Sequence, residues 1–201
     1  MKAHIRCLQV LKAARYFISA SILFTASCGT TLYKVKPPSS LASLPAHSPS
    51  VNLGTLSFRA APLLTDEETQ ELFESNLLLA GLLPVRVEIV HNGGDAVDLK
   101  KVRFHLHDGA GTQWQTLSAK RAIARILKAN GVFAYNPNSR KQFEKEVRAY
   151  ELDQKTPFAH DEIRRQGIVF FLSPGKEAVS SPHGLTMAID GLPQPAVLKL
   201  N

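Results

Sequence analysis

Two histidines stand two residues apart in the stretch RFHLHD, at His105 and His107. Side chains at i and i+2 of an extended strand lie on one face, and imidazole is a common ligand of zinc and copper. A third ligand could come from His91 or Asp108. The spacing therefore raises metal binding as one hypothesis. The alternative is a row of polar side chains that face water, where histidine is an ordinary occupant.

No recognisable catalytic motif accompanies these histidines. The sequence contains no G-x-S-x-G elbow, no H-E-x-x-H pair and no glycine-rich phosphate loop. Neighbouring acids at 67–68 and 161–162 fall on segments that the pattern indicates are solvated. We therefore predict that the protein is not an enzyme and needs no cofactor.

A basic stripe follows Ser118, where AKRAIARILKAN has alanine, isoleucine and leucine at helical spacing. A basic amphipathic helix can lie on anionic lipid headgroups or contact a partner, although its charges can also simply face water. The residues of this possible membrane or partner surface are Lys120, Arg121, Arg125 and Lys128.

Strands would position the histidines. Apolar residues alternate with polar ones over 83–89 and again over 102–106, and Asn92-Gly93-Gly94-Asp95 between them favours a turn. We expect a hairpin in which His91 lies beside the turn, on the strand that partners His105 and His107. Further strands are expected near 55–59, 112–117, 168–172, 185–189 and 197–200, and helices over 66–80, 119–130 and 139–152.

This order of elements indicates the fold class. Strands come first, helices interrupt them over about 118–165, and strands return before the end. We therefore expect a mainly β protein with inserted helices (α+β), built as an antiparallel immunoglobulin-like β-sandwich.

Residues 1–27 have the pattern of a secretory signal peptide. Four basic residues and no acid lie there, and the apolar run FISASILFTA is followed by small residues. The run is shorter than the ~20 residues that cross a membrane, so a permanent anchor helix is the weaker alternative. Without this segment, 20 basic and 17 acidic residues remain, which argues against nucleic-acid binding.

The sequence Thr25-Ala26-Ser27-Cys28-Gly29 resembles the lipobox of bacterial lipoproteins. The resemblance implies that the Cys28 thiol is joined to diacylglycerol and that the signal peptide is cut just before it. Thr25 departs from the family, which prefers an aliphatic residue there, so cleavage elsewhere to give a soluble secreted protein stays open. Gly29 is not the aspartate that favours the inner membrane in enterobacterial lipoproteins, so the outer membrane is the expected destination.

Cysteine usage agrees with this interpretation. The other cysteine, Cys7, lies in the predicted signal, so the mature chain has no pair for an internal disulfide. The proline- and serine-rich stretch 28–50 is predicted to be a lipidated tether. The expected domain covers 51–201.

Three segments also resemble a group of uncharacterised bacterial envelope lipoproteins whose domain is similar to extracellular immunoglobulin-like modules. They are ESNLLLAGLLPVRVEIVHNGG, DGAGTQWQTLSAKRAIARIL and RRQGIVFFLSPG. The expected function is a lipid-anchored cell-envelope protein without catalytic activity, which binds another envelope protein or organises the envelope. The alternative is a metal-binding accessory protein that uses the His105/His107 face.

Overall fold

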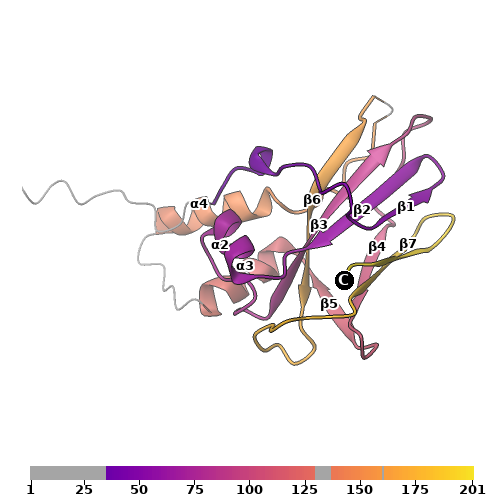
Figure 1. Cartoon of the computed structure of the whole chain (residues 1–201). Coiled ribbons are helices and arrows are strands. Elements are labelled where there is room, and N and C mark those ends of the chain that lie inside the picture. Colours follow the sequence, from indigo (N-terminus) through magenta and orange to yellow (C-terminus); the bar gives the residue numbers. More distant parts are fainter. Residues whose placement is uncertain (1–34, 130–136, 160) are drawn as a thin grey trace, which may run out of the picture. The chain divides into compact units, whose positions relative to one another are not determined.

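Eight strands join edge to edge in one antiparallel sheet, with the order β1-β2-β3-β6-β5-β4-β7-β8 (Figure 1). The computed structural model describes residues 35–129, 137–159 and 161–201. The strands are β1 (Ser50–Leu53), β2 (Leu56–Pro62), β3 (Leu82–His91), β4 (Arg103–His107), β5 (Gln113–Leu117), β6 (Arg164–Leu172), β7 (Thr186–Asp190) and β8 (Ala196–Lys199). The helices are η1 (Pro38–Ser40), α2 (Asp66–Phe73), α3 (Ala119–Ala129) and α4 (Pro137–Arg148).

The sheet folds over a core that its two halves share. Strand β5 forms the corner, because Trp114 pairs with β4 whereas Leu117 pairs with β6. Side chains of β2, β3 and β6 then face those of β4, β7 and β8, and the outer strands β1 and β8 approach each other. The prediction of a mainly antiparallel β fold with helices is confirmed, and a single sheet that nearly closes like a barrel carries all eight strands.

The expected hairpin of 83–89 and 102–107 is wrong. Strand β3 pairs with β2 and β6, whereas β4 pairs with β5 and β7. After His91 the chain crosses to the other half of the sheet, where Val97 bridges to Phe158 before β4 begins. Alternation specifies which face of a strand is buried but not its neighbour, so facing across a core satisfies the same pattern.

The outer face of β3 and β6 changes character along the strands. At one end Leu82, Ile168 and Phe170 contribute to a second core beneath α2, α3 and α4. At the other end the outward residues are polar, and Arg86, Glu88 and others lie there instead. The helices therefore cover only the apolar part of this face (Figure 1).

Helix α2 begins as predicted and ends early. Thr65 Oγ1 accepts a hydrogen bond from the Glu68 amide at 3.2 Å, and the Glu68 carboxylate accepts from the Thr65 amide at 3.0 Å, which completes the capping box. Glu74 adopts a left-handed conformation with φ of 47°, so the helix stops at Phe73 rather than at 80. A similar shift moves the third helix from the expected 139–152 to Pro137–Arg148.

Residues 35–49, which we call the strap, lie against the domain. Val35, Leu41 and Leu44 are buried, and the Ala60 amide donates to the Pro49 carbonyl at 3.1 Å. The stretch 28–50 was expected to be a tether, and its described part packs on the sheet and helices instead of extending from them.

Gly167 allows the segment after α4 to approach β6 closely. The Ile168 amide donates to the Tyr150 carbonyl at 2.6 Å, and the Leu152 amide donates to the Ile168 carbonyl at 3.1 Å. A Cβ on Gly167 would lie 2.5 Å from Leu152 Cα and 2.8 Å from its backbone nitrogen. Only glycine fits at this position without a backbone shift.

We predict that Gly167→Ala lowers the free energy of unfolding by about 1–3 kcal/mol, because backbone rather than a flexible side chain must move. Denaturant unfolding measures the change. The control is Gly175→Ala, where the nearest atoms to an added Cβ belong to Glu177 at 3.7 Å. Equal stability of the two variants would contradict the close packing described here.

Candidate functional site

The expected basic surface divides into an exposed part and a structural part. Lys120, Arg121 and Lys128 of α3 are exposed, and Ala122, Ile123, Ile126 and Leu127 are buried on the opposite side of the helix. Arg125 instead binds the domain, because Nε donates to the Ala80 carbonyl at 3.0 Å and Nη2 to the Lys176 carbonyl at 2.8 Å. Arg125 therefore does not belong to the surface that could meet a membrane or partner.

Helix α4 enlarges this basic surface. It packs beside α3 over the same core and exposes Lys141 and Lys145. The α4 residue Glu144 pairs with two arginines of its own helix, Arg140 at 2.8 Å and Arg148 at 3.4 Å. Lys141 and Lys145 therefore extend the exposed cations of α3 onto the neighbouring helix.

A groove of about 650 Å³ opens where β5 ends and α3 begins. Lys120, Arg148 and Lys155 line it together with Glu151 and Asp153. Both carboxylates are engaged by backbone amides. Glu151 accepts from Ala119 at the start of α3 at 2.8 Å, and Asp153 accepts from Lys155 and Thr156 at 2.9 and 3.2 Å. Hydrogen bonds with Thr156 hold the pKa of Asp153 below its ordinary value.

The three histidines do not form one site. His105 and His107 lie on β4, where the His105 ring contacts Gln113 at 3.2 Å and Asp190 at 3.4 Å. His91 ends β3, which is not paired with β4, and its buried ring packs edge-on against Phe158 at 5.4 Å between centroids. Within the described ranges, no group of three or more histidine, cysteine or acidic residues could hold a metal ion.

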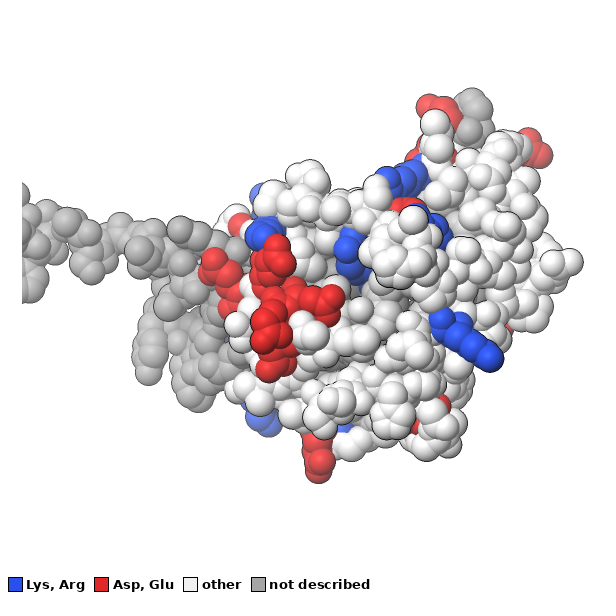
Figure 2. Space-filling model, in the orientation of Figure 1, with Lys and Arg blue, Asp and Glu red and all other residues white. Residues whose placement is uncertain are grey.

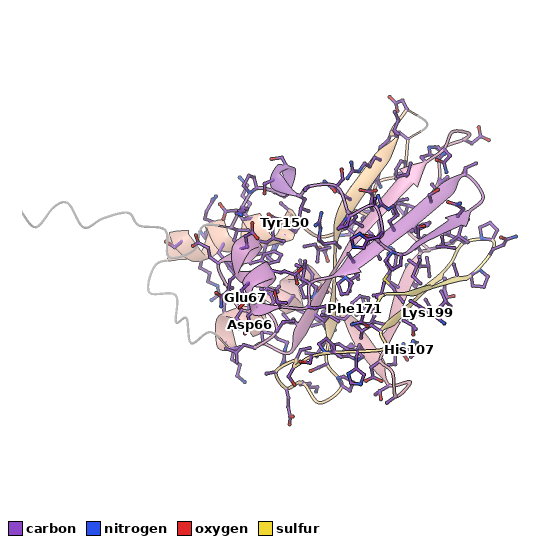
Figure 3. All side chains as sticks on the ribbon, viewed as in Figure 1. Asp66, Glu67, His107, Tyr150, Phe171 and Lys199 are labelled. Carbon is purple, nitrogen blue, oxygen red and sulfur yellow. The ribbon has the colours of Figure 1, made fainter. Side chains whose placement is uncertain are left out.

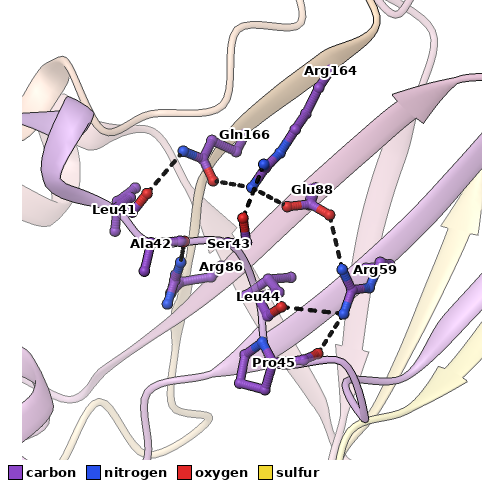
Figure 4. Close-up of polar contacts among 10 residues, drawn as sticks. All are labelled: Leu41, Ala42, Ser43, Leu44, Pro45, Arg59, Arg86, Glu88, Arg164 and Gln166. Atoms are coloured by element: carbon purple, nitrogen blue, oxygen red, sulfur yellow. Dashed lines mark hydrogen bonds and ion pairs between the residues drawn. The ribbon is translucent and has the colours of Figure 1, made fainter.

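A network of charged residues that the sequence pattern did not predict lies on the polar outer face of the sheet. Its centre is Glu88, which is only 3% exposed. Arg59 of β2 pairs with Glu88 Oε1 at 3.1 Å, and Arg164 of β6 pairs with Oε2 (Figure 4). The pairing register explains this geometry, because Glu88 lies directly opposite Arg59 on one side and Gln166 on the other.

The same network holds the strap. Arg59 donates to the carbonyls of Leu44 and Pro45, and Arg164 donates to Ser43 Oγ at 3.0 Å. Two further bonds complete the set (Figure 4): Arg86 to the Ala42 carbonyl and Gln166 to the Leu41 carbonyl. Side chains of three strands thus bind five consecutive strap residues, mostly through main-chain oxygens. Burial beneath the strap lowers the pKa of Arg86.

The first described residues are held at the helices. The Lys36 amide donates to the Leu72 carbonyl at 3.0 Å, and the Tyr150 hydroxyl donates to the Lys36 carbonyl at 2.5 Å. Tyr150 packs edge-on against Phe73 at 5.0 Å, and burial raises the pKa of its hydroxyl. Figure 3 shows Tyr150 among the helices, with His107 and Lys199 away from them on the strands. The chain therefore enters the domain between α2 and the segment that follows α4.

A signal for this network was present in the sequence. Arg86 and Glu88 share the polar face of a strand whose opposite face is apolar over 83–89, and Arg164 and Gln166 alternate in the same way. The pattern showed that these side chains point the same way. It gave no indication that a segment 44 residues before Arg86 and more than 120 residues before Arg164 and Gln166 would cover them.

Comparisons with protein-family models, curated proteins and solved structures found no match. Among the described helices, none is both long enough and apolar enough to span a membrane.

We predict that Glu88→Gln lowers the free energy of unfolding by about 2 kcal/mol, because it leaves two guanidinium groups without a counter-charge. The Arg59 side chain is 22% exposed and that of Arg164 is 38% exposed. Amide exchange over 35–49 should also accelerate, because Arg59 and Arg164 hold the strap. Denaturant unfolding and hydrogen-exchange mass spectrometry measure the two effects.

The matched control is Glu144→Gln, which also removes a carboxylate with two arginine partners. Its side chain is 25% exposed, against 5% for Glu88, so we expect a loss below about 1 kcal/mol and unchanged exchange in the strap. Equal losses of unfolding free energy in the two variants would show that the Glu88 ion pairs stabilise the domain no more than the exposed pairs of Glu144 do.

Proposed function

We propose that this protein is a lipid-anchored, non-catalytic binding module of the bacterial cell envelope. The observation that carries the proposal is the short distance in sequence between Cys28 and the packed domain. The cysteine follows small residues in a lipobox-like sequence, and buried packing begins at Val35. A lipid on Cys28 would therefore hold the domain close to the membrane.

The strap gives this attachment a mechanical basis. Any pull on the anchor reaches the domain at Lys36 and then passes along the strap. There Arg59, Arg86 and Gln166, from three strands, donate to main-chain carbonyls. Because these bonds go mainly to carbonyl oxygens, they do not require particular strap side chains. The load is thus distributed over the central strands of the sheet.

The groove beside α3 is the proposed place for a protein partner. Its acidic residues already bind backbone amides, whereas the side chains of Lys120 and Lys155 have no ion pair in the described part of the chain. A partner with acidic side chains fits this arrangement.

The immunoglobulin-like sandwich and the likeness to uncharacterised envelope lipoproteins remain part of the proposal. The sandwich draws support from two strand layers that face each other across one core and share β5.

The anchor is tested with Cys28→Ala in the full chain, expressed with its own leader in a bacterium. We expect the parent to have a mature mass that starts at Cys28 with added acyl groups and to enter the detergent phase. The variant should lose both the acyl groups and the processing. Cys7→Ala is the matched control and should behave as the parent. A soluble parent, or a chain cut elsewhere, would refute the anchor.

The partner is tested with a photo-crosslinking amino acid at position 155, on the rim of the groove, or at position 199, on the exposed edge of β8. We expect a discrete adduct with one envelope protein from 155 only, and its loss in Lys120→Glu. Adducts of equal yield from both positions would show that the groove has no selective partner.

A further inference from the structure

The position at which the chain enters the domain limits the side that can face a membrane. Lys36 is fixed by Leu72 of α2 and by Tyr150, just after α4. Seven residue steps separate Cys28 from Val35, and at ~3.6 Å per residue they span at most about 25 Å. If Cys28 is lipidated, as proposed above, the helical layer lies next to the lipid surface.

The helical layer has an acidic part and a basic part. Helix α2 and its C-cap expose acidic side chains, which Figure 2 shows gathered on the face seen in Figure 1. They are Asp66, Glu67, Glu68, Glu71 and Glu74. An anionic membrane would repel this part of the layer, so it cannot be the part that lies on such a membrane.

Helices α3 and α4 form the basic part. Their buried sides enter one core with the sheet, so their exposed sides both point away from it. Four exposed cations that lie outside the groove have no ion pair among the described residues: Arg121, Lys128, Lys141 and Lys145. The nearby charge of Glu144 is already balanced by Arg140 and Arg148.

We propose that the exposed side of the α3–α4 pair rests on the anionic headgroups of the membrane that holds the lipid anchor, with acidic α2 turned away. Attraction to a charged leaflet acts only within a Debye length of ~10 Å, so the lipid anchor must first bring the domain close to the membrane. The cations then determine which side of the domain faces the lipid. This orientation leaves the strands β4, β7 and β8 farther from the membrane than the helices.

The test uses the full lipidated chain in nanodiscs of phosphatidylglycerol or of phosphatidylcholine. An amine-acylating reagent labels lysines, and mass spectrometry follows each one. We expect Lys128, Lys141 and Lys145 to be labelled about fivefold more slowly in phosphatidylglycerol, the factor that corresponds to about 1 kcal/mol per residue at such a surface. The exposed Lys100 and Lys199, on the strand side, should be labelled equally in both lipids.

Two double variants sharpen the test. Lys141→Glu with Lys145→Glu should abolish the protection of Lys128, whereas Lys100→Glu with Lys101→Glu should leave it unchanged. Equal labelling in the two lipids would overturn the inference. The inference would also be overturned if these lysines were protected from labelling only in native envelope membranes. That result would mean that an acidic protein, rather than lipid, covers the exposed side of α3 and α4. A chain that fails to enter either nanodisc would instead refute the lipid anchor, which keeps the two failures distinct.

Discussion

The buried carboxylate of Glu88 is the constraint on which the arrangement of this domain depends. A charge in the middle of a sheet face is stable only with partners, and Arg59 and Arg164 supply them from the two adjacent strands. The remaining guanidinium hydrogens then need acceptors of their own, and the strap brings carbonyl and hydroxyl oxygens to them. Burial of one acid therefore links two strands to the strap, which Arg86 and Gln166 bind in addition.

The same outer face explains why helices and strap do not compete for space. Where β3 and β6 present apolar residues, amphipathic helices gain most by covering them, because burial of apolar area is their main stabilisation. Where the strands present Arg86 and Gln166, a helix would bury polar groups without enough acceptors. An extended strap with free carbonyls satisfies those donors. The switch from apolar to polar side chains thus fixes the boundary between helical layer and strap.

The sequence predicted local structure better than spatial relations. The alternation in β3 and β4, the start of α2 at Asp66 and the amphipathic stripe of α3 each concern neighbours along the chain. All three correspond to elements in the structure. Strand pairing, the grouping of the histidines and the docking of the strap depend on segments far apart. Arg125 illustrates this difference. Its spacing places it in the basic stripe, but its guanidinium group donates hydrogen bonds to the carbonyls of Ala80 and Lys176 and so binds the domain itself.

Closure of the sheet also bears on how such a domain can recognise other molecules. Strand addition needs a free edge, yet β1 and β8 contain four residues each and approach one another. The strap and the helices occupy the outer face of the central strands. If the α3–α4 side faces the membrane, as proposed, the groove at the β5–α3 junction and the loops are left for a protein partner. The chain enters beside α2 and α4, close to exposed α3 and α4 cations that have no ion pair among the described residues. A lipid on Cys28, as proposed, would therefore couple attachment to orientation.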